Sequence, residues 1–358
     1  MASRAQDPNA LLFLGAGASR AFGFPTTKEF LDHLKVGAFP EQSALLGQFT
    51  VVSGIADIEH VLDILDQIVS GDNPLVKYLA FHQHKMGPSY DAVEWNVFKE
   101  KTSALREHIR VELFREYEFV EERRQEIQKR LETVLGHVRS GNAKVMNIFT
   151  TNYDSVIEKG LARSQSYELV DGFREEVTGE PAEWDPTIFD ETSSSEKVRV
   201  NLFKLHGSLS WRTAKKTGKI LRVDTEEKSI AGSKRFGENL LLYPASKVPP
   251  IKEPFGMLYT HFARKLLSAR TCFAIGFSFR DPYLNTVFMD FLRRDRGNML
   301  CTISPSANES LRNLFDKANP TEIPEGVVRQ VVALEHRFED RDTEGMITAV
   351  TLQQAKSL

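Results

Sequence analysis

Short runs of apolar residues recur along the chain, and each ends at a glycine or a group of polar residues. The first run, residues 11–14, stops at Gly15, and residues 26–34 then have the spacing of an amphipathic helix with Thr26 or Thr27 as its N-cap. Similar apolar runs lie at residues 145–149, 198–205, 271–275 and 299–303. Strands that alternate with helices in this way predict an α/β fold with a doubly wound parallel sheet of the Rossmann type.

A long stretch between the first two predicted strands has a different pattern. Its apolar residues repeat at helical spacing, first at Ile58, Val61, Leu62, Leu65 and Ile68. Residues 95–117 and 121–138 continue as amphipathic segments, and Gly141 ends the second of them. We therefore predict a Rossmann-like domain of residues 1–39 and 141–358, interrupted by a helical insertion module of residues 40–140.

Two polar stretches interrupt the predicted domain. Residues 171–198 are broken by glycine and proline and are predicted to form a loop. Residues 213–240, rich in lysine, threonine and glycine, are predicted to form a small hairpin.

Composition narrows the class of protein. The 358 residues are 41% hydrophobic and 27% charged, which is typical of a folded water-soluble domain. A net charge of -3 argues against binding to nucleic acid or to an anionic membrane. No apolar run approaches a membrane span, and the N-terminus lacks the apolar core of a signal peptide, so we expect a cytoplasmic protein. The two cysteines, Cys272 and Cys301, are too few for a four-cysteine zinc site.

The first candidate site is the glycine-rich turn that follows the first strand. Gly15 and Gly17 would let the backbone approach a pyrophosphate, with Ala16 between them and Ser19 just beyond. The third glycine of the dehydrogenase fingerprint is replaced by Arg20, which disfavours a hydride-transfer enzyme. A tight turn without a ligand is the alternative.

Two further candidates follow later strands. Asn152 stands in the sequence Thr-Thr-Asn-Tyr-Asp, where an uncharged amide can orient a water and a ribose hydroxyl. His206 stands in Leu-His-Gly-Ser, where an imidazole can exchange a proton near neutral pH. The alternatives are that Asn152 and Asp154 only cap a turn and a helix, and that His206 is a satisfied packing residue.

The fourth candidate is the turn after the strand at residues 271–275. Gly276 permits close approach, and polar groups follow it; Ser304 ends the next strand along the chain. The alternative for Arg280 and Asp281 is a solvated turn with a helix cap.

The motifs GAGAS, TTNYD, LHGS and GFSF, in this order, resemble the sirtuin superfamily, whose matching motifs read roughly GAG-x-S, TQNID, HG and GTS. The variant with TTNYD and SFRDP looks like the sirtuin-like domains of bacterial antiphage systems, which act as NAD hydrolases. The resemblance covers the strand–loop corners within residues 11–36, 144–164, 199–211, 241–243 and 271–305.

The resemblance implies a role for each matching residue. Asn152 would position the attacking water beside the nicotinamide ribose, His206 would act as general base, and Asp154 would face the carboxamide pocket. The remaining cofactor-binding positions implied by the family pattern are Gly15, Ala16, Gly17, Ser19, Gly276, Phe277, Ser278 and Ser304. Thr26 is a further predicted cofactor-binding residue.

Two departures from the sirtuin pattern matter. The G-I-P-D-F-R stretch reads Gly23 to Lys28 here, without its Asp, Phe and Arg, so nicotinamide gating must differ. The four zinc cysteines of deacylating sirtuins are also missing, so we expect no zinc and doubt protein deacylation.

The resemblance therefore implies that NAD is the substrate of an antiphage effector that cleaves the nicotinamide–ribose bond, giving nicotinamide and ADP-ribose or a cyclic form of it. The alternatives are an NAD-dependent protein deacylase and a non-catalytic subunit that binds NAD or ADP-ribose. A homo-oligomer, or a companion defence protein such as an ATPase translocase, is compatible with the helical module.

Overall fold

The computed structural model describes residues 10–36, 44–47, 58–70, 92–139, 141–175, 180–192, 195–223, 235–243, 251–316, 327, 329–340, 343 and 345–350. Its contacts divide the chain into two compact units. Unit 1 comprises residues 1–24, 118–242 and 246–358, and unit 2 comprises residues 25–117 and 243–245. The domain boundaries proposed from the sequence stay a prediction.

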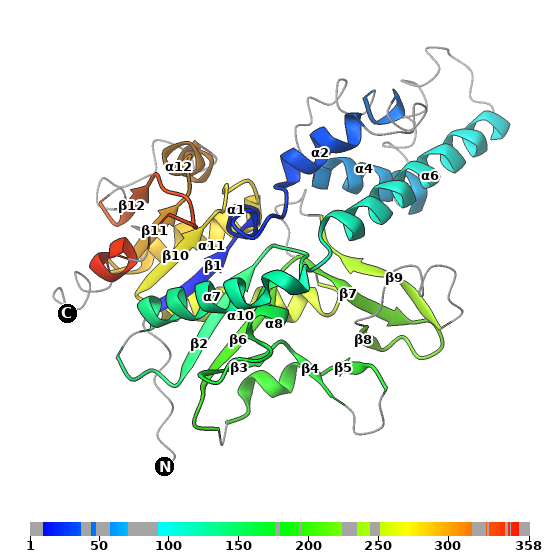
Figure 1. Ribbon diagram of the computed structural model, residues 1–358. Helices are drawn as coiled ribbons and strands as arrows, with labels where there is room; N and C mark the ends of the chain where they lie inside the picture. The colour runs from blue at the N-terminus through cyan, green and yellow to red at the C-terminus, as the bar shows by residue number, and fades with distance from the viewer. Residues whose placement is uncertain are drawn as a thin grey trace. The chain divides into compact units, whose positions relative to one another are not determined.

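Unit 1 is built on a parallel sheet of seven strands (Figure 1). In spatial order these are β12 (Val331–Leu334), β11 (Met299–Ile303), β10 (Thr271–Ile275), β1 (Ala10–Leu14), β2 (Val145–Thr150), β6 (Val198–Lys204) and β3 (Tyr167–Val170). All neighbouring strands pair in parallel. The predicted doubly wound α/β fold is therefore confirmed.

The strand order reverses between β1 and β10. From β1 the chain crosses to β2 on one side, and it later returns to β10 on the other side. Ligands of open α/β sheets bind outside the carboxyl ends of the strands at such a switch point. The turns that follow β1 and β10 are therefore the places to look for a site.

Helices cover both faces of this sheet. Helices α7 (Arg124–Val138) and α8 (Val156–Leu161) pack together on one face, whereas α10 (Phe255–Ser268) and α11 (Pro282–Arg294) lie on the other (Figure 1). Further helices of this unit are α1 (Ala16–Arg20), η1 (Glu121–Arg123) and α12 (Ala307–Asp316).

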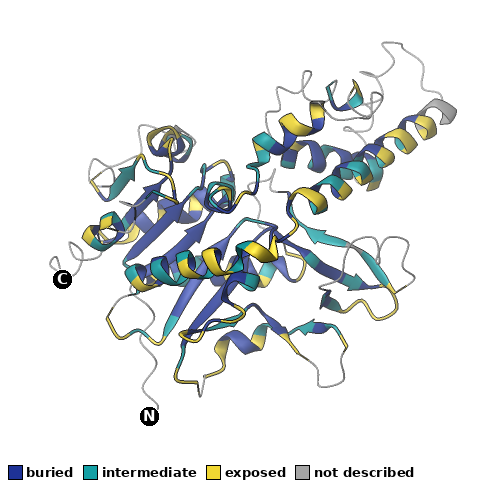
Figure 2. Ribbon diagram, viewed as in Figure 1, coloured by how far each residue is buried: buried dark blue, intermediate teal, exposed yellow. Residues whose placement is uncertain are grey.

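The inner strands of the main sheet are buried, as Figure 2 shows by their dark colour, whereas the edge strands β12 and β3 are mostly half-buried. Strand β1 is buried at all five positions, because a parallel strand covered on both faces needs apolar residues throughout. The ring of Phe13 lies 5.4 Å from that of Phe262 on α10 and 5.3 Å from that of Phe288 on α11.

A second, antiparallel sheet also belongs to unit 1. Its order is β4 (Phe173–Arg174), β5 (Ala182–Trp184), β8 (Ile220–Arg222), β7 (Gly207–Ala214) and β9 (Phe236–Leu241). The predicted loop at residues 171–198 thus contains two short strands and η2 (Pro186–Asp190). Strands of two and three residues carry no sequence periodicity; they form here because Phe173, Trp184 and Trp211 pack together.

Unit 2 contains the predicted helices α2 (Thr27–Val36), α4 (Ile58–Ser70) and α6 (Ala92–Glu116), which contact one another. The apolar positions predicted from residues 58–68 are all buried. Asp66 on α4 forms ion pairs with Arg106 and Arg110 on α6. Among the described helices of the whole chain, none combines the length and apolarity that crossing a bilayer requires.

Candidate active site

The two glycine turns that follow β1 and β10 contact each other directly. The backbone N–H groups of Gly15 and Gly17 donate to the carbonyls of Ile275 and Gly276, at 2.9 and 3.0 Å. A Cβ atom on Gly276 would lie 2.2 Å from the backbone nitrogen of Ala18, and the φ of Gly276 is +63°. Only glycine fits this position. The touching turns at Gly15–Gly17 and Gly276 form a surface of backbone atoms at the switch point of the sheet, which we call the backbone floor.

Asn152 is joined to this floor by hydrogen bonds. Its side-chain nitrogen Nδ2 donates to the carbonyl of Gly15 at 2.9 Å and to the hydroxyl of Ser19 at 2.8 Å. The Ser19 hydroxyl in turn donates to Asp154 Oδ2 at 2.7 Å. The backbone N–H of Asn152 donates to the Thr150 hydroxyl at 3.0 Å. The structure therefore brings four of the predicted residues, Gly15, Ser19, Asn152 and Asp154, into one network.

The other end of the Asn152 amide is the carbonyl oxygen Oδ1, a hydrogen-bond acceptor. The Gly15 carbonyl can only accept, so it fixes which end of the amide is nitrogen. Oδ1 is buried, and no donor within the described part of the chain reaches it. A buried acceptor without a partner costs about 1–3 kcal/mol. The position suits a bound hydroxyl group or water.

A buried lysine, Lys204, forms hydrogen bonds with the loop that carries Asn152. Lys204 is 1% exposed, and its ammonium donates to the carbonyls of Tyr153 and Asp154 and lies 2.8 Å from the Glu158 carboxylate. Burial raises the pKa of Glu158, and the nearby Lys204 ammonium opposes that shift. The sequence analysis assigned Lys204 no role, although a lysine in an otherwise apolar strand was a signal for one.

His206 is buried beside the second sheet. It is 2% exposed, and its carbonyl accepts from the backbone N–H of Leu242 at 2.9 Å. The next residue, Gly207, has a φ of +84°, and a Cβ there would lie 2.0 Å from the Leu240 carbonyl oxygen. The glycine after His206 is thus required by the close approach of β9.

The imidazole of His206 faces a carboxylate from the turn after β10. Its Nε2 lies 3.4 Å from Asp281 Oδ2. The other oxygen of Asp281, Oδ1, accepts from the backbone N–H groups of Tyr283 and Leu284, so Asp281 is the N-cap of α11. The helix cap at Asp281 was an alternative in the sequence analysis and is confirmed; the pairing with His206 was missed.

The turn between Gly276 and Asp281 is strained. Phe279 has a φ of +52°, a left-handed conformation that is rare outside glycine, although its side chain is fully buried. Its carbonyl accepts from Asn285 Nδ2 at 2.8 Å. Strain of this kind persists only where surrounding contacts enforce it, and it concentrates at functional sites.

The remaining predicted residues of unit 1 lie around these turns. Ala16 is half-buried in α1, and Ser278 is half-buried with its carbonyl accepting from Asn313 Nδ2. The Phe277 side chain packs in the core against Phe13. The buried Ser304 accepts at its hydroxyl from the backbone N–H of Ser306. Their cofactor-binding roles stay predictions.

Thr26 lies in unit 2, where it caps α2. Its backbone N–H and hydroxyl donate to the Glu29 carboxylate, and its hydroxyl accepts from the Glu29 N–H. This reciprocal arrangement is a capping box, and it confirms Thr26 as an N-cap. Its predicted contact with the cofactor stays a prediction.

Tyr153 connects the two halves of the site. It follows Asn152 directly, and its ring centroid lies 6.3 Å from that of His206. Its carbonyl accepts from the backbone N–H of Leu209, in the strand that begins after His206. The prediction that the side chains of Asn152 and His206 reach one sugar is compatible with this connection.

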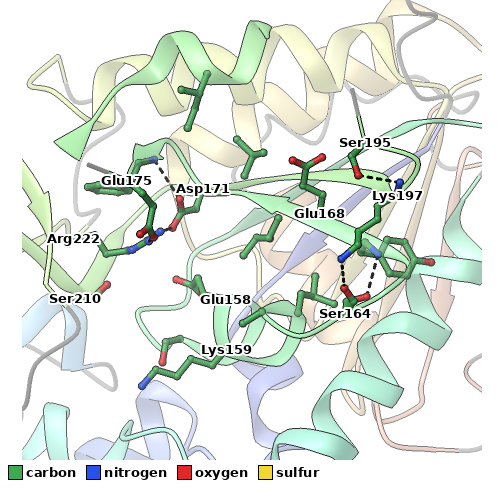
Figure 3. Close-up of a pocket in the computed structure, with 18 of the residues that line it drawn as sticks. Glu158, Lys159, Ser164, Glu168, Asp171, Glu175, Ser195, Lys197, Ser210 and Arg222 are labelled. Atoms are coloured by element: carbon green, nitrogen blue, oxygen red, sulfur yellow. Dashed lines mark hydrogen bonds and ion pairs between the residues drawn. The ribbon is translucent and has the colours of Figure 1, made fainter. Parts of the chain in front are cut away.

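A separate cavity of 560 Å³ lies beside β3 and α8 (Figure 3). It contains none of the predicted site residues. Its charged lining is balanced, with the basic residues Arg124, Lys159, Lys197 and Arg222 and the acidic residues Glu158, Glu168, Asp171 and Glu175. Several of these charges already form ion pairs, such as Arg222 with Asp171, so the lining selects no ligand charge.

Both cysteines are buried as free thiols in neighbouring strands, Cys272 in β10 and Cys301 in β11. Burial raises the pKa of both thiols, and that of Cys301 to about 12. Among the described residues, no cluster of three or more histidine, cysteine, aspartate or glutamate side chains is arranged to hold a metal ion.

We expect neither thiol to react with a disulfide reagent in the native protein at pH 8, because only an exposed thiolate attacks such a reagent. Both should react once the chain is unfolded in denaturant. The measurement is absorbance of the released thiol; rapid modification of one native thiol would contradict the burial of that strand.

Known proteins resemble this chain in sequence and in fold. Residues 146–323 match the family described as SIR2-like domain. No curated protein matches the chain. A mutant Sir2 homologue in complex with ADP-ribose is 14% identical, with a TM-score of 0.42, and the match covers 97% of this chain and 92% of that chain. A Sir2 homologue in complex with NAD is 12% identical, with a TM-score of 0.40, over 97% and 90% of the two chains.

Proposed function

We propose that this chain is an NAD hydrolase that cleaves the nicotinamide–ribose bond. Its residues 146–323 match a SIR2-like domain. The observation that carries the proposal is the Asn152 side chain, whose Oδ1 is buried without a described donor while its Nδ2 is held by the glycine turn. An acceptor held this way beside a backbone floor suits a ribose hydroxyl or a water next to a diphosphate.

The diphosphate would lie over the glycine turn. At Gly15, Gly17 and Gly276 the space of a side chain is filled by the backbone of the opposite turn, so these glycines hold the two turns in contact. The joined turns would present the backbone on which the diphosphate binds. The predicted residues Ala16, Ser19, Ser278 and Ser304 would complete the cofactor contacts.

The reaction would proceed by departure of nicotinamide and attack of water. As the glycosidic bond breaks, its electron pair goes to the pyridinium nitrogen, so nicotinamide leaves neutral and positive charge builds on the ribose ring. The Asn152 carbonyl would orient the water, and His206 would accept its proton as the new carbon–oxygen bond forms. A well-placed general base contributes about 10²- to 10⁴-fold in rate. The products are nicotinamide and ADP-ribose, or a cyclic form if a ribose hydroxyl attacks instead.

The motif variant of the sequence, TTNYD with SFRDP, supports the further proposal that this activity depletes NAD in antiphage defence. A homo-oligomer, or a companion protein such as an ATPase translocase, would then control the activity.

The test is mass spectrometry of NAD incubated with the purified full chain, with and without an acyl-lysine peptide, beside the His206→Ala variant. We expect nicotinamide and ADP-ribose in equal amounts, without any need for the peptide, and loss of both in the variant. Turnover that requires the peptide and yields acyl-ADP-ribose would show a deacylase. NAD binding without cleavage, unchanged in the variant, would show a non-catalytic binding subunit.

A further inference from the structure

We propose that Asp281 is a positioning residue that holds His206 with its proton on Nε2 and so leaves Nδ1 as the nitrogen that accepts the proton. The inference rests on the proposed function for its catalytic consequence. It concerns Asp281, to which the family resemblance gave no role and which the sequence analysis considered only as a helix cap.

The two carboxylate oxygens of Asp281 have separate partners. Oδ1 accepts from the N–H groups of Tyr283 and Leu284, at 2.8 and 2.9 Å, and is thereby tied to the N-terminus of α11. Oδ2 is turned away from that helix end and lies 3.4 Å from His206 Nε2. The helix cap therefore sets the direction of the oxygen that the imidazole faces.

The contact between Nε2 and Oδ2 has the distance of an ion pair and is not aligned as a hydrogen bond. An ionised carboxylate can only accept hydrogen bonds, so we infer that the imidazole nitrogen beside it is the one that carries the proton. The lone pair of a neutral ring is then on Nδ1. The side chains of His206 and Asp281 are each 3% exposed, and charge interactions are stronger in a site shielded from water. The carboxylate would thus also stabilise the imidazolium that forms when Nδ1 takes a proton.

The titratable groups that the structure places beside this pair are phenols from three elements. The Tyr259 hydroxyl on α10 donates to Asp281 Oδ2 at 3.5 Å, and the Tyr283 ring lies tilted against that of Tyr259, with 5.3 Å between the ring centroids. Tyr153 lies on the His206 side of the pair. Ordinary phenols stay neutral at pH 7, so among these groups of the described residues the Asp281 carboxylate carries the charge that we infer to orient the imidazole.

The variant Asp281→Asn separates the two tasks of this residue. The N–H groups of α11 need an acceptor, so the amide oxygen should keep the place of Oδ1 and preserve the cap. The amide nitrogen then takes the place of Oδ2 and presents a donor to Nε2. The imidazole must respond by moving its proton to Nδ1. In serine proteases the same change keeps the geometry, selects the wrong tautomer and costs about 10⁴ in kcat.

The experiment is nitrogen NMR of the full chain labelled in its histidines, with the His206 signals assigned by comparison with His206→Gln. We expect the Nε2–H form in the wild type and the Nδ1–H form in Asp281→Asn, with little change in the midpoint of thermal unfolding. NAD cleavage should fall about 10²- to 10⁴-fold in the variant. The same tautomer in both proteins would overturn the inference.

A matched control is Asp290→Asn, which makes the same chemical change at an exposed position of the same helix. It should alter neither the tautomer nor the rate. The tautomer can be read whether or not the chain cleaves NAD. Failure of the proposed function would therefore appear as a wild type with the predicted tautomer and no cleavage, and failure of the inference as cleavage without the tautomer switch.

Discussion

Replacing Asn152 with alanine is expected to reduce NAD cleavage by about 10²- to 10³-fold, an effect of the size seen when one oriented polar group is removed from an active site. The substitution removes the acceptor Oδ1, which the Gly15 carbonyl and the Ser19 hydroxyl hold in place from the other end of the amide. Under the proposed mechanism, the attacking water would then lose its orientation toward the ribose carbon.

The same substitution should leave the chain folded. It removes two hydrogen bonds, to Gly15 and to Ser19, each of which contributes about 0.5–1.5 kcal/mol to stability. The measurement is the rate of nicotinamide release, with urea unfolding monitored in parallel. Asn308→Ala is a matched control, because Asn308 is exposed on α12. Full activity in a folded Asn152→Ala variant would remove Asn152 from the site.

Replacing Gly276 with alanine is expected to destabilise unit 1 by about 2–5 kcal/mol, the sum of a left-handed conformation and an overpacked contact. The new Cβ would lie 2.2 Å from the backbone nitrogen of Ala18 and 2.6 Å from the Cα of Gly17. Backbone atoms on both sides leave no flexible side chain to move aside. The turns after β1 and β10 would have to separate, and the floor on which the diphosphate should bind would open.

Gly218→Ala isolates the conformational part of this effect. Gly218 has a φ of +71°, close to that of Gly276, yet no described atom lies within 4 Å of the Cβ position. Its substitution should cost about 1–2 kcal/mol and leave NAD binding unchanged. Urea unfolding and NAD titration of both variants check this. Equal losses at the two positions would show that the turns do not need their close contact.

Local patterns in the sequence determined the elements that surround the site. Residues 11–14 and 271–275 had to be interior strands, because a strand covered on both faces needs an unbroken apolar run. Asp281 before a proline had to be a candidate helix cap, because its carboxylate can satisfy the N–H groups of the first turn. The motif order added the family resemblance, and with it Asn152 and His206.

Only the tertiary structure decided which of these places meet. Gly15 and Gly276 touch because the strand order reverses between β1 and β10, and no local pattern encodes strand order. The same reversal lets the turn that carries Asp281 reach His206. Packing of aromatic rings adds β4 and β5, strands too short to show a period, to the second sheet. The periodicity of a sequence predicts which face of a helix or strand is buried. Which other element packs on that face depends on contacts between residues far apart in the chain.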